Sequence, residues 1–173
     1  MFCHGCGTKL PELGVVNFCP ECGKEVVSKV VNRLVVREGS IYYEPGYDQP
    51  FTGKFISRYA NGQIEKEVHY KDGLAEGLYI AWHLTGRKES EGLYKSGKQE
   101  GLWTWWNDQG QQIIEKHYKD GIKHGLWIDW HANGQRKVEG HFKEGKREGL
   151  ITIWNKEGEK MSERMYQDDE RVN

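Results

Sequence analysis

From about residue 50 to the end of the chain, short runs of apolar and aromatic residues alternate with polar turns, and the pattern returns every 24 residues. In each copy, an extended run precedes an Asn-Gly-like turn, and a second extended run ends at a Lys-Asp-Gly-like turn. Such a unit predicts a β-hairpin, and a fixed period predicts that the hairpin is copied along the chain. The glycines that mark the period are Gly53, Gly77, Gly101, Gly125 and Gly149, then Gly62, Gly86, Gly110, Gly134 and Gly158, then Gly73, Gly97, Gly121 and Gly145.

Positions within a copy can be counted from its opening glycine. Positions one, three and five carry mainly Leu, Ile and Trp, and they share one face of a strand because side chains alternate. Position two is large and points to the other face. Its residues are Phe55, Tyr79, Trp103, Trp127 and Ile151. Both faces therefore carry apolar surface, and we expect the sheet to curl or to be covered.

Position seventeen is always aromatic, from Tyr70 in the first copy to Tyr166 in the last. If the first turn is a tight two-residue loop, this position lies opposite the opening glycine. We then expect each ring to lie over bare glycine backbone, a contact that compensates for glycine in strands.

The amino-acid composition indicates a fold of thin layers held by aromatic contacts. Apolar residues make up 36% and charged residues 29%, while the chain holds 7 tryptophans and 9 tyrosines. The formal net charge is -1, and no basic region concentrates a phosphate backbone. No apolar run approaches the roughly 18 residues of a membrane span. No secretory signal is visible at the start, so we expect a cytoplasmic protein.

All four cysteines, Cys3, Cys6, Cys19 and Cys22, form two C-x2-C pairs. Paired thiolates at this spacing wrap one tetrahedral zinc ion. Two disulfides would require an oxidising compartment, a redox pair would require a βαβ context, and a catalytic zinc would keep an open position. Residues 1–27 resemble a zinc ribbon, which implies one structural Zn²⁺ held by the four cysteines.

The sequence predicts three parts: a zinc ribbon at 1–27, a linker with the first strands at 28–48, and five hairpin repeats at 49–173. Residues 24–36 fit either a helical stripe or a strand, and their β-branched content favours a strand from about Arg33. The segment REGS at 37–40 indicates a turn before a second short strand. The charged end QDDERVN has lost the third glycine, which Asp169 replaces, and it is expected to discourage further strand addition.

The segments EGLYIAWHLTG, EGLWTWWNDQG and HGLWIDWHANGQRKVEGHFKEGK resemble the MORN-variant repeats of bacterial proteins of the YwqK-like antitoxin family. The resemblance covers roughly residues 41–173. It implies an all-β fold, an elongated and twisted antiparallel sheet of stacked β-hairpins, with a binding role and no catalysis. The zinc ribbon ahead of the repeats departs from the simplest members.

The histidines do not indicate an active site. His69, His117 and His141 recur at position sixteen, and His83 and His131 recur at position six. Residues repeated in register are more often scaffold than a single convergence of unlike catalytic groups, so we predict no enzyme activity. The glutamates at position fourteen are expected to pair with lysine or arginine across strands.

Trp105 breaks its column, which otherwise holds Ser57, Ala81, Asp129 and Ile153. A repacked core or an exposed aromatic patch would each explain it. The favoured hypothesis is a protein-interaction module, with a toxin as one possible partner. Its predicted partner-binding residues are Tyr79, Trp103, Trp105 and Trp127. The alternative is a nucleic-acid-binding adaptor that uses the zinc ribbon, with the repeats as scaffold, although its near-neutral charge disfavours it. Membrane attachment ranks below both, because the chain has neither a polybasic stretch nor an amphipathic helix.

Overall fold

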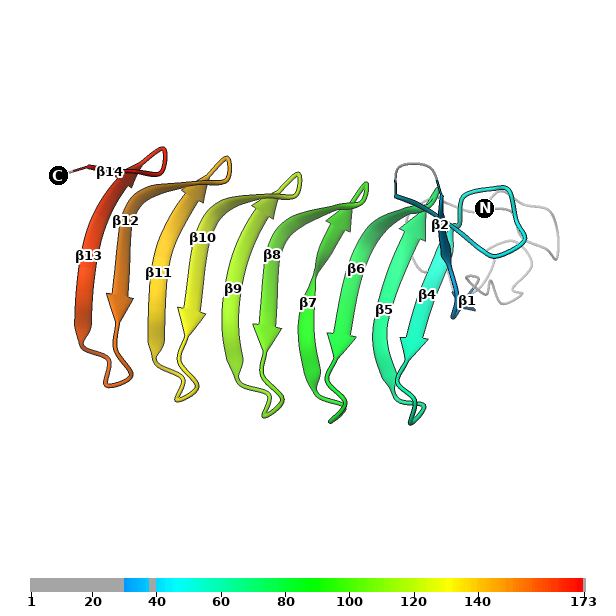
Figure 1. Cartoon of the computed structure of the whole chain (residues 1–173), viewed down its shortest axis with the longest axis horizontal. Coiled ribbons are helices and arrows are strands. Elements are labelled where there is room, and N and C mark those ends of the chain that lie inside the picture. Colours follow the sequence, from blue (N-terminus) through cyan, green and yellow to red (C-terminus); the bar gives the residue numbers. More distant parts are fainter. Residues whose placement is uncertain (1–29, 38–39, 173) are drawn as a thin grey trace, which may run out of the picture.

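The computed structural model describes residues 30–37 and 40–172, and in this part of the chain every regular element is a strand. Twelve strands form one long sheet in the order β1-β4-β5-β6-β7-β8-β9-β10-β11-β12-β13-β14, and β2 and β3 form a separate hairpin (Figure 1). All neighbours in the long sheet are antiparallel except β1 and β4, which are parallel. No helix in the described ranges could cross a membrane. The predicted zinc ligands lie outside the described residues.

The strand bounds follow the 24-residue period closely. They are β1 (Val30–Val31), β2 (Val35–Arg37), β3 (Ile41–Tyr43), β4 (Gly53–Arg58), β5 (Ile64–Lys71), β6 (Leu74–Trp82), β7 (Lys88–Lys95), β8 (Lys98–Trp106), β9 (Gln112–Lys119), β10 (Ile122–Trp130), β11 (Arg136–Lys143), β12 (Lys146–Trp154), β13 (Lys160–Gln167) and β14 (Glu170–Val172). The expected ladder of hairpins is therefore confirmed.

The first turn of each copy is longer than the tight two-residue loop on which the expected register was based. In the first copy, Tyr59 N–H donates to the Gln63 carbonyl at 2.9 Å, so three residues form the loop, and Gly62 closes it with φ +85°. A three-residue loop ending in left-handed glycine is a common hairpin connection. A register shift between Ser57 and Arg58 then adds one residue on β5. The longer loop and the bulge offset each other, so the predicted register remains.

The second turn of each copy is a two-residue turn. Lys71 pairs with Leu74, and the intervening Asp72 and Gly73 both have positive φ, at 50° and 75°. This is the type I′ geometry whose twist matches that of paired strands. The same geometry recurs at Ser96-Gly97, Asp120-Gly121, Glu144-Gly145 and Asp168-Asp169.

The opening glycines bend the sheet. Gly77 has φ +85°, and the register of β5 with β6 shifts between Val68 and Tyr70 at the same level. Figure 1 shows β6, β8, β10 and β12 bending sharply near their type I′ turns. The bend brings successive turns together, so Gly97 N–H donates to the Ala75 carbonyl at 2.8 Å and Gly121 N–H to the Gln99 carbonyl at 2.9 Å. Neighbouring copies are thus joined at their turns as well as along their strands.

The predicted ring-over-glycine contact occurs at a different glycine column. Position seventeen does pair with the opening glycine, as in Gly77 with Tyr94 and Gly101 with Tyr118. However, a Cβ added at Gly77 or Gly101 would meet nothing within 4 Å, so no ring covers these glycines. The covered glycine is Gly92, where an added Cβ would overlap the indole of Trp103. The expectation was wrong for the opening glycines because they serve the bend, where positive φ alone requires glycine.

The lead-in segment closes the first end of the sheet. Tyr42 N–H donates to the Gly73 carbonyl at 2.9 Å, and Phe51 N–H donates to the Tyr42 carbonyl at 2.8 Å. Phe51 is buried, and the ring of Tyr42 lies 4.9 Å from that of Tyr70. Tyr70 of the first copy therefore packs against two rings of the lead-in segment.

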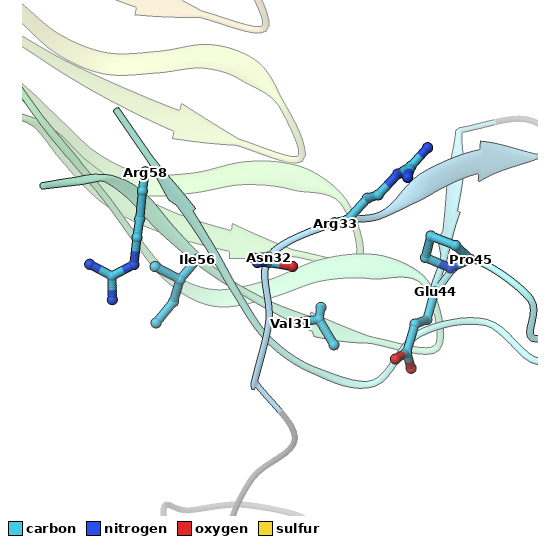
Figure 2. A pocket seen from close by; sticks show the side chains of 7 residues that line it. All are labelled: Val31, Asn32, Arg33, Glu44, Pro45, Ile56 and Arg58. Atoms are coloured by element: carbon cyan, nitrogen blue, oxygen red, sulfur yellow. The ribbon is translucent and has the colours of Figure 1, made fainter. Parts of the chain in front are cut away.

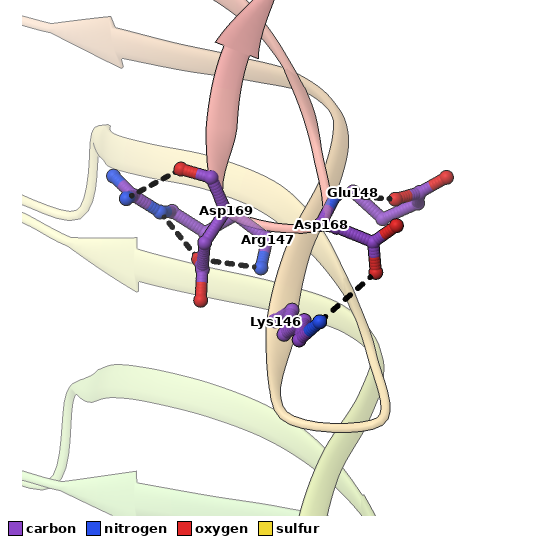
Figure 3. A network of polar contacts seen from close by, with 5 residues as sticks. All are labelled: Lys146, Arg147, Glu148, Asp168 and Asp169. Atoms are coloured by element: carbon purple, nitrogen blue, oxygen red, sulfur yellow. Dashed lines mark hydrogen bonds and ion pairs between the residues drawn. The ribbon is translucent and has the colours of Figure 1, made fainter.

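In the second turn of the last copy, aspartate stands where the other copies have glycine, and charged side chains stabilise the turn. Asp169 keeps the left-handed conformation with φ 71°, and its carboxylate accepts hydrogen bonds from the backbone N and the Nε of Arg147, both at 2.8 Å (Figure 3). Lys146 reaches Asp168 at 3.4 Å, and Asp168 N–H donates to Glu148 at 3.2 Å. Short, charged β14 follows, and such an edge discourages further strand pairing.

Acid should loosen this last turn. Hydrogen bonds from the Arg147 side chain, then from its backbone, lower the pKa of Asp169 below its ordinary 3.8. A carboxyl with a lowered folded-state pKa stabilises the fold above its unfolded pKa, and the contribution is lost as pH falls through the folded value. We expect Asp169→Asn to melt below the wild type near neutral pH and to converge with it below pH 3.8. Thermal unfolding of both proteins across pH checks this, and a gap that stays constant in acid contradicts it.

Candidate interaction surface

The long sheet has two unlike faces. The aromatic face carries positions two and seventeen of each copy and the extra indole of Trp105. Its aromatic residues are Phe55, Tyr70, Tyr79, Tyr94, Trp103, Trp105, Tyr118, Trp127, Phe142 and Tyr166. The leucine face carries positions one, three and five. Its main apolar residues are Leu78, Leu93, Leu102, Leu126 and Leu150, with Trp82, Trp106, Trp130 and Trp154.

Trp103 lies at the centre of the main cluster on the aromatic face. Its side chain is only 3% exposed, and its ring centre lies 5.0 Å from Tyr94, 5.3 Å from Tyr79 and 5.8 Å from Trp105. Its Nε1 donates to the Leu93 carbonyl at 3.1 Å. Because glycine stands beneath it at position 92, the indole can lie flat on the sheet, and the neighbouring rings close around it. Separations in this range are favourable for aromatic pairs.

The four predicted contact residues therefore occupy different places. Tyr79 and Trp105 are partly exposed and touch Trp103, which is buried beneath them and gives them support. Trp127 is also partly exposed, but it packs in a second cluster, 5.0 Å from Phe142. Whether these residues bind a partner stays a prediction.

The phenols of the aromatic face are held in their neutral form. Burial raises the pKa of Tyr79, of Tyr94 and of Tyr118. Burial also raises the pKa of Tyr70, reinforced by the neighbouring tyrosines. At physiological pH the face therefore presents neutral rings with hydroxyl groups.

Two lysines join the aromatic clusters, and the sequence reasoning missed both. Lys116 pairs with Trp103 on one side and Trp127 on the other, and its Nζ lies 4.9 Å from the Trp127 ring and 5.8 Å from the Trp105 ring. Lys123 lies 4.9 Å from the same Trp127 ring. The sequence held one sign of Lys116: the copies on either side have glycine at its position, at 92 and 140.

The leucine face is also exposed, but its polar groups are largely engaged. Leu78, Leu93, Leu102 and Leu150 are between 41% and 48% exposed. Lys54 pairs with Glu67 across strands at 2.5 Å, as expected for position fourteen. The pairs Lys88–Glu91, Arg136–Glu139 and Lys160–Glu163 instead lie within one strand, since the bulge brings positions eleven and fourteen together.

The histidines act as connectors between copies. His83 Nε2 lies 2.8 Å from the Trp106 carbonyl, and His131 Nε2 lies 3.0 Å from the Trp154 carbonyl. Tyr59, at the same position in the first copy, donates to the Trp82 carbonyl at 2.6 Å. The position-six row therefore has the scaffold role that its recurrence predicts. No group of three potential metal-ligating side chains occurs within residues 30–37 and 40–172.

A hollow of about 540 Å³ lies where β1 meets β4 (Figure 2). None of the residues that line it is a histidine, cysteine or serine, and Arg58 is engaged with the Gly62 carbonyl at 2.9 Å. The lining does not supply a nucleophile with a base. The lining residues are Val31, Asn32, Arg33, Glu44, Pro45, Ile56 and Arg58.

Comparison with known families supports the repeat assignment. The family model described as MORN repeat variant matches residues 51–72 and 123–144, which cover most of the first and the fourth copies. Together with the ladder of hairpins, these matches support the assignment of MORN-type repeats. Repeats of this type are generally protein-interaction modules and generally non-catalytic. A search of curated proteins finds no match.

Proposed function

We propose that this chain is a non-catalytic interaction module that binds a partner protein on its aromatic face, around Trp105. The observation that carries the proposal is the placement of that residue. Trp105 departs from a column of smaller side chains, packs on buried Trp103, and remains partly exposed. A large ring held on a rigid base loses little entropy on binding, and Trp and Tyr dominate the binding energy of interfaces.

Tyr79 and Trp127 extend the proposed contact along the sheet. Tyr79 shares the Trp103 stack, while Trp127 lies beyond Lys116 in the neighbouring copy. A partner that covers all three would rest on consecutive hairpins, each fixed by strand pairing and turn contacts. The family resemblance adds a toxin as one such partner, which makes an antitoxin role a specific form of the proposal.

The test compares the two faces of a single strand. After crosslinking in the native host identifies a partner, its affinity is measured for the wild type, Trp105→Ala and Leu102→Ala. Leu102 is 43% exposed on the leucine face of the same strand, which makes it a matched control. We expect Trp105→Ala to weaken binding by about 30-fold, as for an interface residue worth about 2 kcal/mol, and Leu102→Ala to change it little. Loss of binding with Leu102→Ala alone would assign the interface to the leucine face.

We also propose that Cys3, Cys6, Cys19 and Cys22 bind one structural Zn²⁺. The support is their spacing, because two C-x2-C pairs match a closed tetrahedral shell. Metal analysis of the purified chain is expected to give one zinc per chain, and a Cys19→Ser, Cys22→Ser double variant is expected to lose it. Since the repeat sheet is built from other residues, its thermal unfolding should change little on zinc removal. A metal-free chain, or zinc retained by the double variant, would refute the site.

A further inference from the structure

Repeats three and four contain a cationic seat on the aromatic face, formed by Lys116, Lys123 and the ring of Trp127. In the copies on either side, the position of Lys116 is Gly92 or Gly140, which a large neighbour covers: Trp103 covers Gly92, and Ile151 covers Gly140. At Lys116 a long side chain rises from the sheet instead. Its ammonium lies over Trp127 and faces Trp105, at ring-centre distances of 4.9 and 5.8 Å.

Lys123 brings a second ammonium to the same ring. Its Nζ lies 4.9 Å from the Trp127 ring centre and 5.0 Å from that of Phe142. Lys123 follows the type I′ turn and pairs with Tyr118 of the aromatic face, and the strand then bends at Gly125, which has φ 92°. Two cations from consecutive strands therefore converge on one indole.

Neither of these lysines forms an ion pair with a carboxylate in the described part of the chain. Lysines elsewhere do, for example Lys54 with Glu67 and Lys160 with Glu163. Asp129 lies on the same face and its charge acts on Lys116, and its carboxylate accepts a hydrogen bond from Trp127 Nε1 at 2.6 Å. The seat thus holds two positive charges and one negative charge, that of Asp129.

The surroundings make this excess charge costly. Burial lowers the pKa of Lys116; the charge of Asp129 opposes this lowering, and the charge of Lys123 adds to it. A partly buried ammonium that forms no direct ion pair gains more from a carboxylate than a solvated surface lysine does, because part of its desolvation has already occurred on folding. The rings around it provide apolar contact for the residues that flank such a carboxylate.

We propose that the Lys116–Lys123–Trp127 seat binds a carboxylate from an acidic, apolar-flanked peptide segment of the partner protein. This inference rests on the proposed function of the aromatic face and adds the chemistry of its partner. A negatively charged group is the complementary occupant, because the seat places two ammonium groups at one indole ring between the aromatic clusters. An anionic membrane surface is less well matched, because lipid binding draws on a broad set of basic residues, each of which contributes little.

The probe for the test is an acetylated and amidated peptide, Leu-Glu-Phe-Glu-Leu, compared with its Leu-Gln-Phe-Gln-Leu counterpart by calorimetric titration into the full chain. We expect the glutamate peptide to bind and the glutamine peptide to bind about tenfold more weakly or worse. Lys116→Gln and Lys123→Gln should each weaken the glutamate peptide by about tenfold. Lys88→Gln is the matched control, because Lys88 lies 5.3 Å from the Trp106 ring on the leucine face and is paired with Glu91.

Several outcomes would overturn the inference: no binding of the glutamate peptide, equal binding of both peptides, or an equal effect of Lys88→Gln. Binding to phosphatidylserine-containing vesicles that depends on Lys116 and Lys123, without peptide binding, would assign the seat to lipid. If a native partner depends on Trp105 but not on Lys116 or Lys123, the inference fails and the proposed function stands. If peptide binding depends on both lysines while Trp105→Ala leaves the affinity for the native partner unchanged, the proposed aromatic interface fails instead.

Discussion

Truncating Trp103 to alanine is expected to lower the free energy of unfolding by about 3–5 kcal/mol, the usual cost of removing a large buried aromatic side chain. The ring is 3% exposed and contacts Tyr79, Tyr94 and Trp105, so its removal leaves a cavity that three rings line. It also leaves the Leu93 carbonyl without the indole donor. Chemical denaturation monitored by circular dichroism measures the change.

Trp105→Ala is the control for this prediction, because the two residues lie on the same face of the same strand. Trp105 is partly exposed and packs on Trp103 from outside, so its truncation opens the cluster to water without leaving a closed cavity. We expect a clearly smaller loss of stability. An equal loss for both variants would mean that Trp103 is not the buried support of the aromatic face.

Adding one methyl group at Gly92 is expected to destabilise the protein by about 3 kcal/mol, the upper part of the usual range for an overfilled core. A Cβ at this position would overlap Cγ, Cδ2 and Cε2 of Trp103. The indole is rigid and enclosed, so it can yield only by leaving its place among the neighbouring rings. Gly92 has no left-handed φ, and the effect would therefore come from lost space rather than from backbone strain.

Gly140→Ala is the matched control, since Gly140 occupies the same position two copies later. Its added Cβ would lie 3.0 Å from Cγ1 of Ile151, a flexible side chain that can shift by a small amount. We expect a loss of about 1 kcal/mol or less. A double-mutant cycle with Trp103→Ala isolates the contact, because Gly92→Ala should cost little once the indole is gone. An unchanged cost in that background would refute the proposed overlap.

Much of the fold follows from repetition in the sequence. The glycine columns locate both turns of each copy except the second turn of the last, where Asp169 replaces glycine. The alternation of side chains separates the aromatic face from the leucine face. The pairing of position seventeen with the opening glycine was also predicted, although the assumed turn was not the one formed. A two-residue loop and a three-residue loop with one bulge give the same register, so the column pattern does not distinguish them.

The candidate site was predictable only in part. The departure of Trp105 from its column pointed to the aromatic face, but Trp103 and Trp105 have the same residue type and lie on the same face. Their different burial depends on Gly92 on one neighbouring strand and on the rings of Tyr79 and Tyr94. The convergence of Lys116 and Lys123 on Trp127 depends on the bend at Gly125, which sequence columns do not show.

The sequence by itself determined the hairpin unit, its 24-residue period and the assignment of residues to the two faces, because these depend on local turn chemistry and on the two-residue alternation of strands. Only the tertiary structure decided which rings are buried, which glycine is covered and where two lysine ammonium groups meet. Those features depend on distances between side chains of different strands, which are set by bends and bulges in the backbone.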